Sequence, residues 1–382
     1  MKITDVRIVS SKKPIVLPEP WKPAMSRPSA EPRRTTRFDY FEICTDEDIT
    51  GIGPSYSLSS LPPSYLEFVK EAVVGSDPFH VEYFWENYMS GRWDVPGSLG
   101  GVDTALWDLV GKALGVPVCK LLGVYHDRIP AYAATYQLHS PEEHAKETVE
   151  FRDQGIRAIK LRLHRQNHED DLKVVEAVRD AVGDDMDVMV DANQNNLAPG
   201  YNYWSRRTAM WMARKLDALD VFFFEDPLPL SDVAGIKQLV DAVDMPISGG
   251  EHSRHIYEFR DLLFNEVFDI VQPDLIMGSP GVGMTGMGKV ARMAQSVGRL
   301  VVPHVYPGAI CGLNLAATLQ VLASVSNSPY VEYPLEPPAL TVENQHGILK
   351  EPILIEKDGC IRIPQQPGIG VEIDEEFVKR YL

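Results

Sequence analysis

From about residue 129 onward, short apolar runs alternate with amphipathic stretches at intervals of roughly thirty residues. The stretches between the runs carry apolar residues at helical spacing, as in Val174, Val178 and Ala181. Eight such units predict an α/β fold, a (β/α)8 barrel with its catalytic groups at the C-terminal ends of the strands. The predicted strands are residues 131–136, 158–163, 187–192, 221–225, 246–251, 269–273, 299–304 and 330–333.

The N-terminal part of the chain has a different texture. Residues 38–44 and 49–53 are β-prone runs on either side of a turn-like acidic segment, which predicts a hairpin. Residues 17–37 and 54–63 are rich in proline, serine or arginine and follow neither a helical nor a strand period. We interpret both as irregular loops, either mobile surface or lids over a binding site.

The C-terminal tail also lies outside the eight repeated units. Residues 359–363 have strand-like composition, and we expect this tail to return to the N-terminal domain. The predicted division is therefore an α+β domain of residues 1–125, joined by the tail at 350–382, and a barrel domain of residues 126–349.

Cationic residues line one face of the second predicted strand. Because side chains alternate along a strand, Lys160, Arg162 and His164 point one way and apolar residues point the other. Charge buried in a strand that is covered on both faces is too costly unless it faces water or a ligand. We expect these residues to face a functional site; the alternative is an exposed edge strand.

Three consecutive predicted strands end in carboxylates, namely Asp191, Glu225 and Glu251. Each acid taken singly is more often a salt-bridge partner or a helix cap. Together, three converging carboxylates would repel one another, and a hard divalent cation with oxygen ligands resolves that repulsion. The pattern therefore predicts a Mg²⁺ site with open positions for substrate, and Asn193 faces the same way.

The next strands end in Asp274 and His304, which we expect to be neighbours. A carboxylate that holds one ring nitrogen of a histidine fixes the tautomer and makes the other nitrogen a better base. Taken alone, a histidine after a proline is usually a satisfied loop residue. Glu332 has a comparable position in the eighth strand and is expected to bind substrate or stabilise developing charge.

Charge and composition exclude several classes of protein. The chain has 37 lysines and arginines against 54 acids, a net charge of -17, which disfavours a nucleic-acid partner. It offers no apolar stretch long enough for a membrane span and no signal-like N-terminus. Its four cysteines follow no metal-site or disulfide spacing. We therefore expect a cytoplasmic protein.

Several motifs together resemble a known family, the mandelate racemase/muconate lactonizing enzyme-like branch of the enolase superfamily. The resemblance implies a capping domain over a modified (β/α)8 TIM-like barrel that often lacks its last helix, with the two proline-rich loops as specificity lids. We also expect a homo-oligomer. The motifs are Gly101-Val102-Asp103-Thr104-Ala105-Leu106-Trp107-Asp108 with Gly111-Lys112, Lys160-Leu161-Arg162, the three carboxylates, Gln272-Pro273-Asp274 and Pro303-His304.

The resemblance implies Mg²⁺-assisted removal of the proton next to a substrate carboxylate. The common family pattern has a second lysine where this chain has Arg162, and arginine is a poor base because it stays protonated. Our hypothesis is that His304, oriented by Asp274, removes the α-proton while Lys160 and Arg162 hold the acid end. One competent base favours elimination, so the resemblance points to a dehydratase acting on a small carboxylate, a sugar acid (aldonate or aldarate).

Other readings stay open at this point. A racemase, epimerase or lactone cycloisomerase would use Lys160 as an opposing base, and a Schiff-base aldolase would use the same lysine differently. A catalytically silent binding protein is a further class. Residues 195–204 are polar and aromatic and either line the site mouth or pack elsewhere. His252 and His255 are equally suited to substrate contact and to ordinary loop roles.

Overall fold

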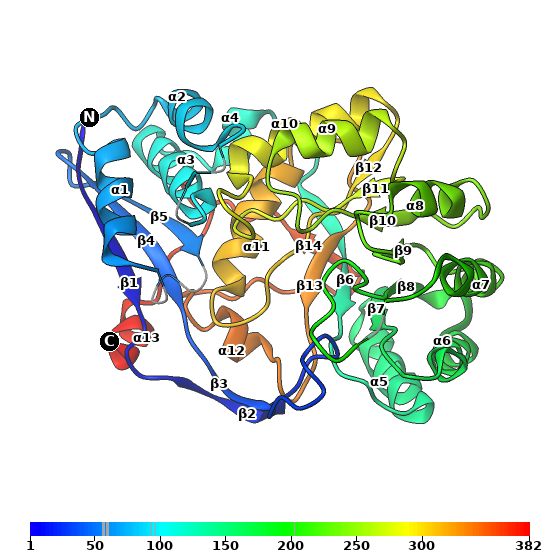
Figure 1. The fold of residues 1–382 in the computed structure, drawn as a ribbon. Helices are drawn as coiled ribbons and strands as arrows, with labels where there is room; N and C mark the ends of the chain where they lie inside the picture. Colours follow the sequence, from blue (N-terminus) through cyan, green and yellow to red (C-terminus); the bar gives the residue numbers. More distant parts are fainter. Residues whose placement is uncertain (56–57, 59–60, 93, 96, 202) are drawn as a thin grey trace.

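The computed structural model describes residues 1–55, 58, 61–92, 94–95, 97–201 and 203–382. Eight parallel strands form one curled sheet in the order β12-β11-β10-β9-β8-β7-β6-β13, at the centre and right of Figure 1. Their bounds are β6 (Arg128–Ala134), β7 (Ala158–Arg162), β8 (Asp187–Asp191), β9 (Phe224–Glu225), β10 (Ile247–Gly249), β11 (Ile270–Val271), β12 (Leu300–Val301) and β13 (Val331–Pro334).

The last strand of the barrel pairs with the first, as Val331 aligns with Ala131. β12 and β13 end the sheet path. Val301 N–H of β12 donates to the Asn327 carbonyl before β13 at 3.0 Å, and Val305 N–H after β12 donates to the Glu332 side chain of β13 at 3.1 Å. The predicted barrel is confirmed, although the ladders are shorter than the apolar runs.

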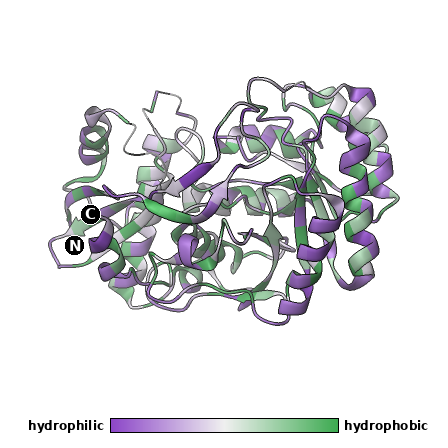
Figure 2. Cartoon of the chain, turned by 90° about the horizontal axis from the view of Figure 1, so that it is seen from below, coloured by the Kyte–Doolittle hydropathy of each residue, from purple (hydrophilic) through white to green (hydrophobic). Residues whose placement is uncertain are grey.

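Seven helices connect successive barrel strands in the described chain. After β13 the chain has the short α12 (Val342–His346) and then the tail, in agreement with the modified barrel that the resemblance implied. Figure 2 shows hydrophilic residues on the outer faces of the barrel helices. The connecting helices are α5 (Pro141–Gln154), α6 (His168–Val182, followed by the 3-10 turn Gly183–Asp185), α7 (Arg206–Asp217), α8 (Val233–Val240), α9 (Ile256–Phe264), α10 (Gly283–Ser296) and α11 (Cys311–Leu322).

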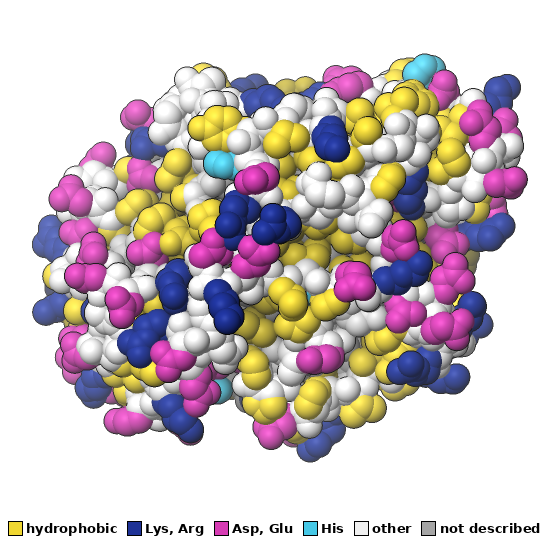
Figure 3. All heavy atoms as spheres, turned by 180° about the vertical axis from the view of Figure 1, so that it is seen from behind, with side chains coloured by type: hydrophobic (Ala, Val, Ile, Leu, Met, Phe, Trp, Pro, Cys, Tyr) yellow, Lys and Arg dark blue, Asp and Glu magenta, His cyan; other side chains and the backbone are white. Residues whose placement is uncertain are grey.

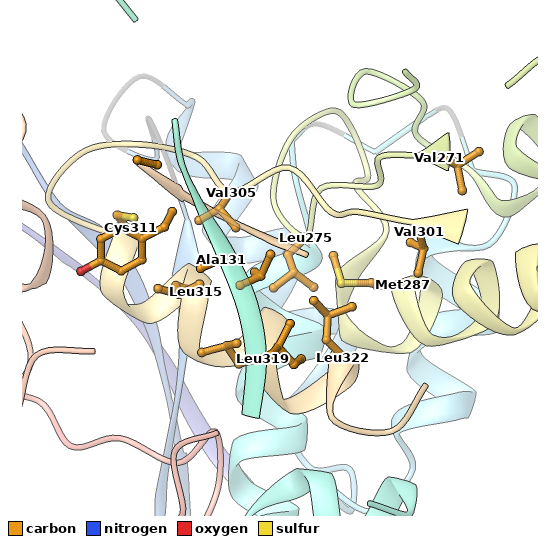
Figure 4. Packing of buried hydrophobic residues seen from close by; sticks show 14 of the residues in the cluster. Ala131, Val271, Leu275, Met287, Val301, Val305, Cys311, Leu315, Leu319 and Leu322 are labelled. Carbon is orange, nitrogen blue, oxygen red and sulfur yellow. The ribbon is translucent and has the colours of Figure 1, made fainter. Parts of the chain in front are cut away.

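The barrel core is built from strand and helix side chains that are almost fully buried. α11 is buried along its whole length, because it lies between the strands and the capping domain. Figure 4 shows this packing, with Met287 of α10 and Leu322 of α11 directed toward strand residues such as Val301. Such close-packed surroundings fix the backbone at the strand ends and therefore the side chains that these ends carry.

The capping domain at the left of Figure 1 contains the predicted hairpin. β4 (Asp39–Thr45) pairs antiparallel with β5 (Thr50–Ser55), and β1 (Ile3–Ser10) pairs with the other edge of β4. The apolar sides of three helices form one cluster with the sheet, namely α1 (Pro63–Val73), α2 (Val81–Phe84) with the π-helical turn Trp85–Met89, and α3 (Gly100–Leu114). The short α4 (Val118–Leu122) buries Val118 and Cys119 in the larger core cluster of the barrel instead.

Residues 17–37 are only partly irregular, which corrects the prediction. β2 (Ile15–Trp21) and β3 (Arg33–Thr36) form a two-stranded antiparallel sheet, and Trp21 aligns with Arg33. Ile15, Leu17 and Trp21 are buried, so a period of two is present, but two prolines hide it. Proline is tolerated there because an edge strand does not need every N–H group. Of the second predicted loop, residues 56–57 and 59–60 lie outside the described residues.

The tail divides between the two domains. β14 (Cys360–Arg362) pairs with the start of β6, in the barrel sheet, and so the strand-like segment does not join the N-terminal sheet as expected. α13 (Glu375–Tyr381) does return to the N-terminal domain, because the N–H groups of Lys12 and Lys13 donate to the Tyr381 carbonyl at 2.9 and 3.0 Å. The domain boundaries themselves stay a prediction.

A buried carboxylate joins the capping domain to the barrel. Asp103 of α3 accepts hydrogen bonds from the backbone N–H and the hydroxyl of Thr285, at 2.9 and 2.7 Å, in the first turn of α10. Gly283 permits this approach, since a Cβ there would lie 2.6 Å from the Asp103 carboxylate. Burial raises the pKa of Asp103 to about 7, although the bonds from Thr285 act in the opposite direction.

The surface carries charges of both signs. Figure 3 shows lysine and arginine interspersed with aspartate and glutamate over one face of the molecule. None of the helices in the described part of the chain is long and apolar enough to cross a bilayer.

Candidate active site

Lys160 lies at the centre of a buried charge network at the strand ends. Its Nζ is 2.7 Å from Glu225 Oε2 and 3.0 Å from Glu332 Oε1, and all three side chains are buried. Burial lowers the pKa of Lys160, but the two carboxylates outweigh this effect and raise the pKa above its ordinary value. Lys160 is therefore held as a fixed cation.

Arg162 lies two residues further along the same face of β7. Its guanidinium pairs with Asp191, donates from Nε to the Thr135 carbonyl at 2.8 Å, and lies 4.6 Å from the ring centroid of Tyr136. β7 lies between β6 and β8, so the alternative of an exposed edge strand is wrong. The cationic face predicted from the alternation of side chains points into the barrel.

Asn193 connects Asp191 with His164. Its backbone N–H and side-chain amide donate to the two Asp191 oxygens at 2.7 and 2.8 Å, and its Oδ1 lies 2.9 Å from His164 Nε2. Asn193 adopts a left-handed backbone with φ of 43°, which turns its side chain back toward the strand end. Burial lowers the pKa of His164 to about 4, so it is neutral and donates to the amide oxygen.

Glu225 ends β9 in surroundings crowded with negative charge. One oxygen accepts from Gln272 Nε2 at 2.9 Å, whereas Oε1 is buried without a hydrogen-bond partner among the described residues. Burial and then the charge of Asp191 raise the pKa of Glu225 to about 7, against the effect of Lys160. Glu225 therefore carries a buried oxygen without a partner among the described residues, close to other acidic groups.

His304 and Asp274 form the predicted pair. His304 Nδ1 lies 2.6 Å from one Asp274 oxygen, and the other oxygen accepts the N–H groups of Ile276 and Met277 at 2.6 and 2.7 Å. An aspartate held in this way accepts a hydrogen bond from the Nδ1–H group and fixes the ring, so Nε2 is the reactive nitrogen. This nitrogen lies 3.5 Å from Glu251 Oε2.

The protonation of His304 depends on its acidic neighbours. Burial would lower its pKa, but the charges of Glu251 and Glu332, together with the bond to Asp274, raise it to about 10. Any group that neutralises these carboxylates lowers this pKa by Coulomb's law, because the imidazolium loses its stabilising partners.

Glu251 and Glu332 occupy the remaining strand-end positions. Glu251 lies 3.0 Å from His252 Nε2. Burial raises the pKa of Glu251, but His304 and His252 lower it below its ordinary value. The second oxygen of Glu332 accepts the Val305 N–H at 3.1 Å, which ties the eighth strand to the loop after the seventh.

The three predicted metal ligands come from consecutive strands and influence one another's charge. Asp191 aligns with Glu225 in the β8–β9 ladder, and after burial the charges of Asp191 and Glu251 also act to raise the pKa of Glu225. In this arrangement each carboxylate also contacts a cationic or imidazole group, and the three do not have ligand atoms all within 4.8 Å of one another. Among the described residues, ligand atoms within 4.8 Å of one another are found in His139, His144 and Glu147. There the backbone N–H of His139, just before α5, donates to Nε2 of His144.

The donor set nevertheless fits a hard divalent cation. All three ligands offer carboxylate oxygens, which Mg²⁺ prefers over nitrogen or sulfur. The unpartnered, buried Glu225 Oε1 is available to a ligand, and the raised pKa of Glu225 reflects repulsion that a cation would relieve. Asp191, Glu225 and Glu251 are the residues that would hold the ion.

A cavity of about 280 Å³ lies above the strand ends. Its floor contains Arg162, Asn193, Glu251 and His304 from the barrel. Its other side is formed by the segment containing β2 and β3, so the capping domain closes the site. The remaining lining residues are Trp21, Pro23, Met25, Ser26, Arg33, Tyr136, Asn196, Met277, Tyr306 and Pro307.

Sequence reasoning missed Asp226, and the structure also locates His255, which the sequence left open. Asp226 follows Glu225 and is buried, and burial together with Glu251 raises its pKa well above the ordinary value. Its position beside a strand-ending acid was the only sequence signal. Both ring nitrogens of His255 are without a hydrogen-bond partner in the described chain, and His255 does not line the cavity.

The polar segment at 195–204 reaches both the cavity and the capping domain. Asn196 lines the cavity, and the Tyr201 hydroxyl donates to the Ala24 carbonyl at 2.9 Å. Trp204 packs on Phe224 in the barrel, with ring centroids 6.1 Å apart. One end of the segment therefore borders the site mouth and the other is core, while Asn202 lies outside the described residues.

Comparisons with known proteins agree with this geometry. Residues 143–377 match the family model for the enolase C-terminal domain-like fold, and residues 11–123 match that for the mandelate racemase/muconate lactonizing enzyme N-terminal domain. L-talarate/galactarate dehydratase of Salmonella typhimurium is 30% identical over 88% of this chain and 80% of that protein.

Other relatives carry different activities. The 3,6-anhydro-alpha-L-galactonate cycloisomerase of Streptomyces coelicolor is 29% identical over 89% of this chain and 91% of its own. The crystal structure of L-talarate dehydratase from Polaromonas sp. JS666, complexed with Mg and L-glucarate, is 27% identical, with a TM-score of 0.81, and covers 100% of this chain and 97% of that one. This chain belongs to the enolase superfamily, in the branch of mandelate racemase and muconate lactonizing enzyme.

Proposed function

We propose that this protein is a Mg²⁺-dependent sugar-acid dehydratase. It removes the α-proton of an aldonate or aldarate and expels the β-hydroxyl as water, giving a 2-keto-3-deoxy acid. The observation that carries the proposal is the His304–Asp274 pair, the single group with the geometry of a base at the cavity floor in the described chain. The similarity to dehydratases of related acids supports it.

The metal would be held by Asp191, Glu225 and Glu251. A related dehydratase was crystallised with Mg and a sugar acid, and the oxygen donors here suit the same ion. When bound, Mg²⁺ would neutralise the substrate carboxylate and the negative charge that develops on it as the α-proton leaves.

His304 moves the proton. Asp274 accepts from Nδ1, so Nε2 faces the cavity and takes the α-proton from the substrate. The protonated ring is then a suitable acid: it returns the proton to the departing β-hydroxyl, the C–O bond breaks, and water leaves. The resulting enol rearranges to the keto acid by moving its hydroxyl proton to the adjacent carbon.

Lys160 and Arg162 bind and orient rather than exchange protons. The Nζ of Lys160 is occupied by two buried ion pairs, with Glu225 at 2.7 Å and Glu332 at 3.0 Å, so we assign Lys160 an electrostatic role. Arg162 is permanently charged and is suited to a carboxylate. A racemase needs a competent base on each face of the α-carbon, and this pairing of Lys160 argues against one.

A lactone cycloisomerase is the second candidate. The cycloisomerase of Streptomyces coelicolor is nearly as similar to this chain as the dehydratase is. The same base and cations would serve the first proton transfer, and the outcome would then depend on which group the substrate expels. The cytoplasmic location, the homo-oligomeric state and the domain boundaries also stay predictions.

Screening separates these functions. The enzyme is incubated with Mg²⁺ and a library of mono- and dicarboxylic sugar acids and their lactones in D₂O, with semicarbazide to trap keto products. A dehydratase yields a semicarbazone of a product that has lost one water from the substrate, and EDTA abolishes it. Deuterium in recovered substrate without a keto product would establish a racemase or epimerase, and a deuterated isomer of a lactone substrate would establish a cycloisomerase.

A further inference from the structure

The reaction cavity contains a second arginine, opposite the barrel floor. We infer that Arg33 forms a distal carboxylate-binding position, so that the preferred substrates are hydroxylated dicarboxylic acids rather than monoacids. The inference rests on the proposed function, which left the choice between the two classes open. Arg33 lies on β3 in the capping domain and lines the same cavity as Arg162.

A continuous row of aromatic rings connects the two arginines. The Arg33 guanidinium lies 5.6 Å from the ring centroid of Trp21, and Trp21 meets Tyr136 edge-on with centroids 5.5 Å apart. Tyr136 in turn lies 4.6 Å from the guanidinium of Arg162. This wall of the cavity is therefore aromatic between two cations, which places a carboxylate-binding group at each end of the wall.

The position of Arg33 is built into the fold. Trp21 aligns with Arg33 in the β2–β3 ladder, and its indole N–H donates to Glu336 Oε2 at 2.8 Å. The other Glu336 oxygen accepts the N–H groups of Tyr136 and Gln137, each at 2.7 Å. The ring under the guanidinium is thus anchored to the barrel through a buried carboxylate.

Arg33 has charge available for a ligand. It forms no ion pair with a carboxylate in the part of the chain that the structure describes, although Arg162 pairs with Asp191. The nearby Arg37 already donates to the carbonyls of Ser11 and Lys12. In a protein with a net charge of -17, a guanidinium at the cavity wall that no carboxylate neutralises among the described residues is the local attraction that a doubly charged ligand needs.

Space for the far end of a substrate adjoins this position. A second cavity of about 290 Å³ shares Trp21, Arg33, Tyr306 and Pro307 with the first. Arg33 lies at their border, because it lines both cavities. A planar guanidinium binds a carboxylate through two parallel hydrogen bonds, which a terminal hydroxymethyl group cannot reproduce.

The test compares Arg33→Gln with Arg34→Gln, a matched change at the next residue, which is exposed and lines neither cavity. Substrates are supplied as pairs that differ only at the last carbon: galactarate with galactonate, and glucarate with gluconate. We expect wild-type enzyme to prefer the diacids, and Arg33→Gln to reduce the diacid-to-monoacid ratio of kcat/KM about tenfold, the value of one charged hydrogen bond. Arg34→Gln keeps the wild-type ratio.

A binding measurement keeps the two proposals separate. Calorimetric Kd values for the same pairs are measured with Mg²⁺ in a His304→Asn background, where proton removal is blocked. A rise in the diacid Kd that exceeds the rise in the monoacid Kd on adding Arg33→Gln supports the distal position, even if no library member is dehydrated. Equal effects on both classes, or no effect, would overturn it, whereas an absence of turnover alone counts against the dehydratase function.

Discussion

The strand ends of the barrel and the β2–β3 sheet line one cavity, yet they hold their cations differently. Lys160 and Arg162 are buried on a central strand and each is paired with carboxylates. Arg33 is exposed on a two-stranded sheet and is stacked on an aromatic ring. Under our two proposals, the paired cations at the strand ends serve the proton chemistry, and Arg33, which has no carboxylate partner among the described residues, selects the substrate.

The largest effect is expected from removing the proposed base at the strand ends, His304. We expect His304→Asn to reduce kcat about a thousandfold, in the range for loss of a general acid or base, with a much smaller effect on substrate affinity. The measurement is turnover of the best library substrate, together with exchange of its α-proton in D₂O, which should also stop. His80→Asn, an exposed histidine before α2, is the control. Retained α-proton exchange in His304→Asn would show that another residue is the base.

The paired state of the floor can be tested through stability. Lys160→Met leaves Glu225 and Glu332 without their shared cation, and breaking a buried ion pair in this way costs about 3–5 kcal/mol. We expect a loss of that size in the free energy of urea unfolding, partly restored by adding Glu332→Gln. Lys173→Met removes an exposed pair with Asp170 and should reduce the free energy of unfolding far less than Lys160→Met does. Similar losses for the two lysines would contradict the description of Lys160 as a locked cation.

The contact of Asp103 with Thr285, between the capping domain and the barrel, predicts a smaller and pH-dependent effect on stability. Because burial raises the pKa of Asp103 to about 7, the folded state holds this proton more tightly than the unfolded state. The contribution of Asp103 to the free energy of unfolding is complete below about pH 4 and is lost as the pH rises through about 7. The free energy of unfolding falls over this range by at most about 1.4 kcal/mol per pH unit.

Asp103→Asn should therefore flatten the decline of Tm between pH 5 and 8. Thermal unfolding of both proteins across this range measures the difference. Asp244→Asn, at an exposed position, should follow the wild-type curve. If the Asp103→Asn curve runs parallel to that of the wild type, the carboxyl group does not titrate with folding.

Much of the site at the strand ends was predictable from the sequence, but little of the β2–β3 side of the cavity was. Lys160, Asp191 and Glu225 follow from period-two alternation and from the position of strand ends, which are local properties. The roles of Glu336 and Asp226 depend on contacts with distant segments, and nothing in their neighbouring residues signals such contacts. The β2–β3 sheet was missed because its prolines suppress the usual strand signal while still permitting an edge pairing.

The charge pairing of the carboxylates was also beyond sequence reasoning. Asp191, Glu225 and Glu251 were expected as a set of metal ligands, and their convergence is present in the structure. Which acid takes Lys160 and which takes Arg162 is decided by side-chain geometry across neighbouring strands, which the order of residues does not specify.

The bonds of Glu336 have a consequence for engineering. This one carboxylate follows the last barrel strand, accepts the backbone after the first, and holds the indole of Trp21. Glu336 thereby links the first and last barrel strands to each other and to the β2–β3 segment. A chimera that exchanges residues 15–36 for those of a relative must carry a compatible residue at 336, or the exchange will also weaken the contact between the first and last barrel strands.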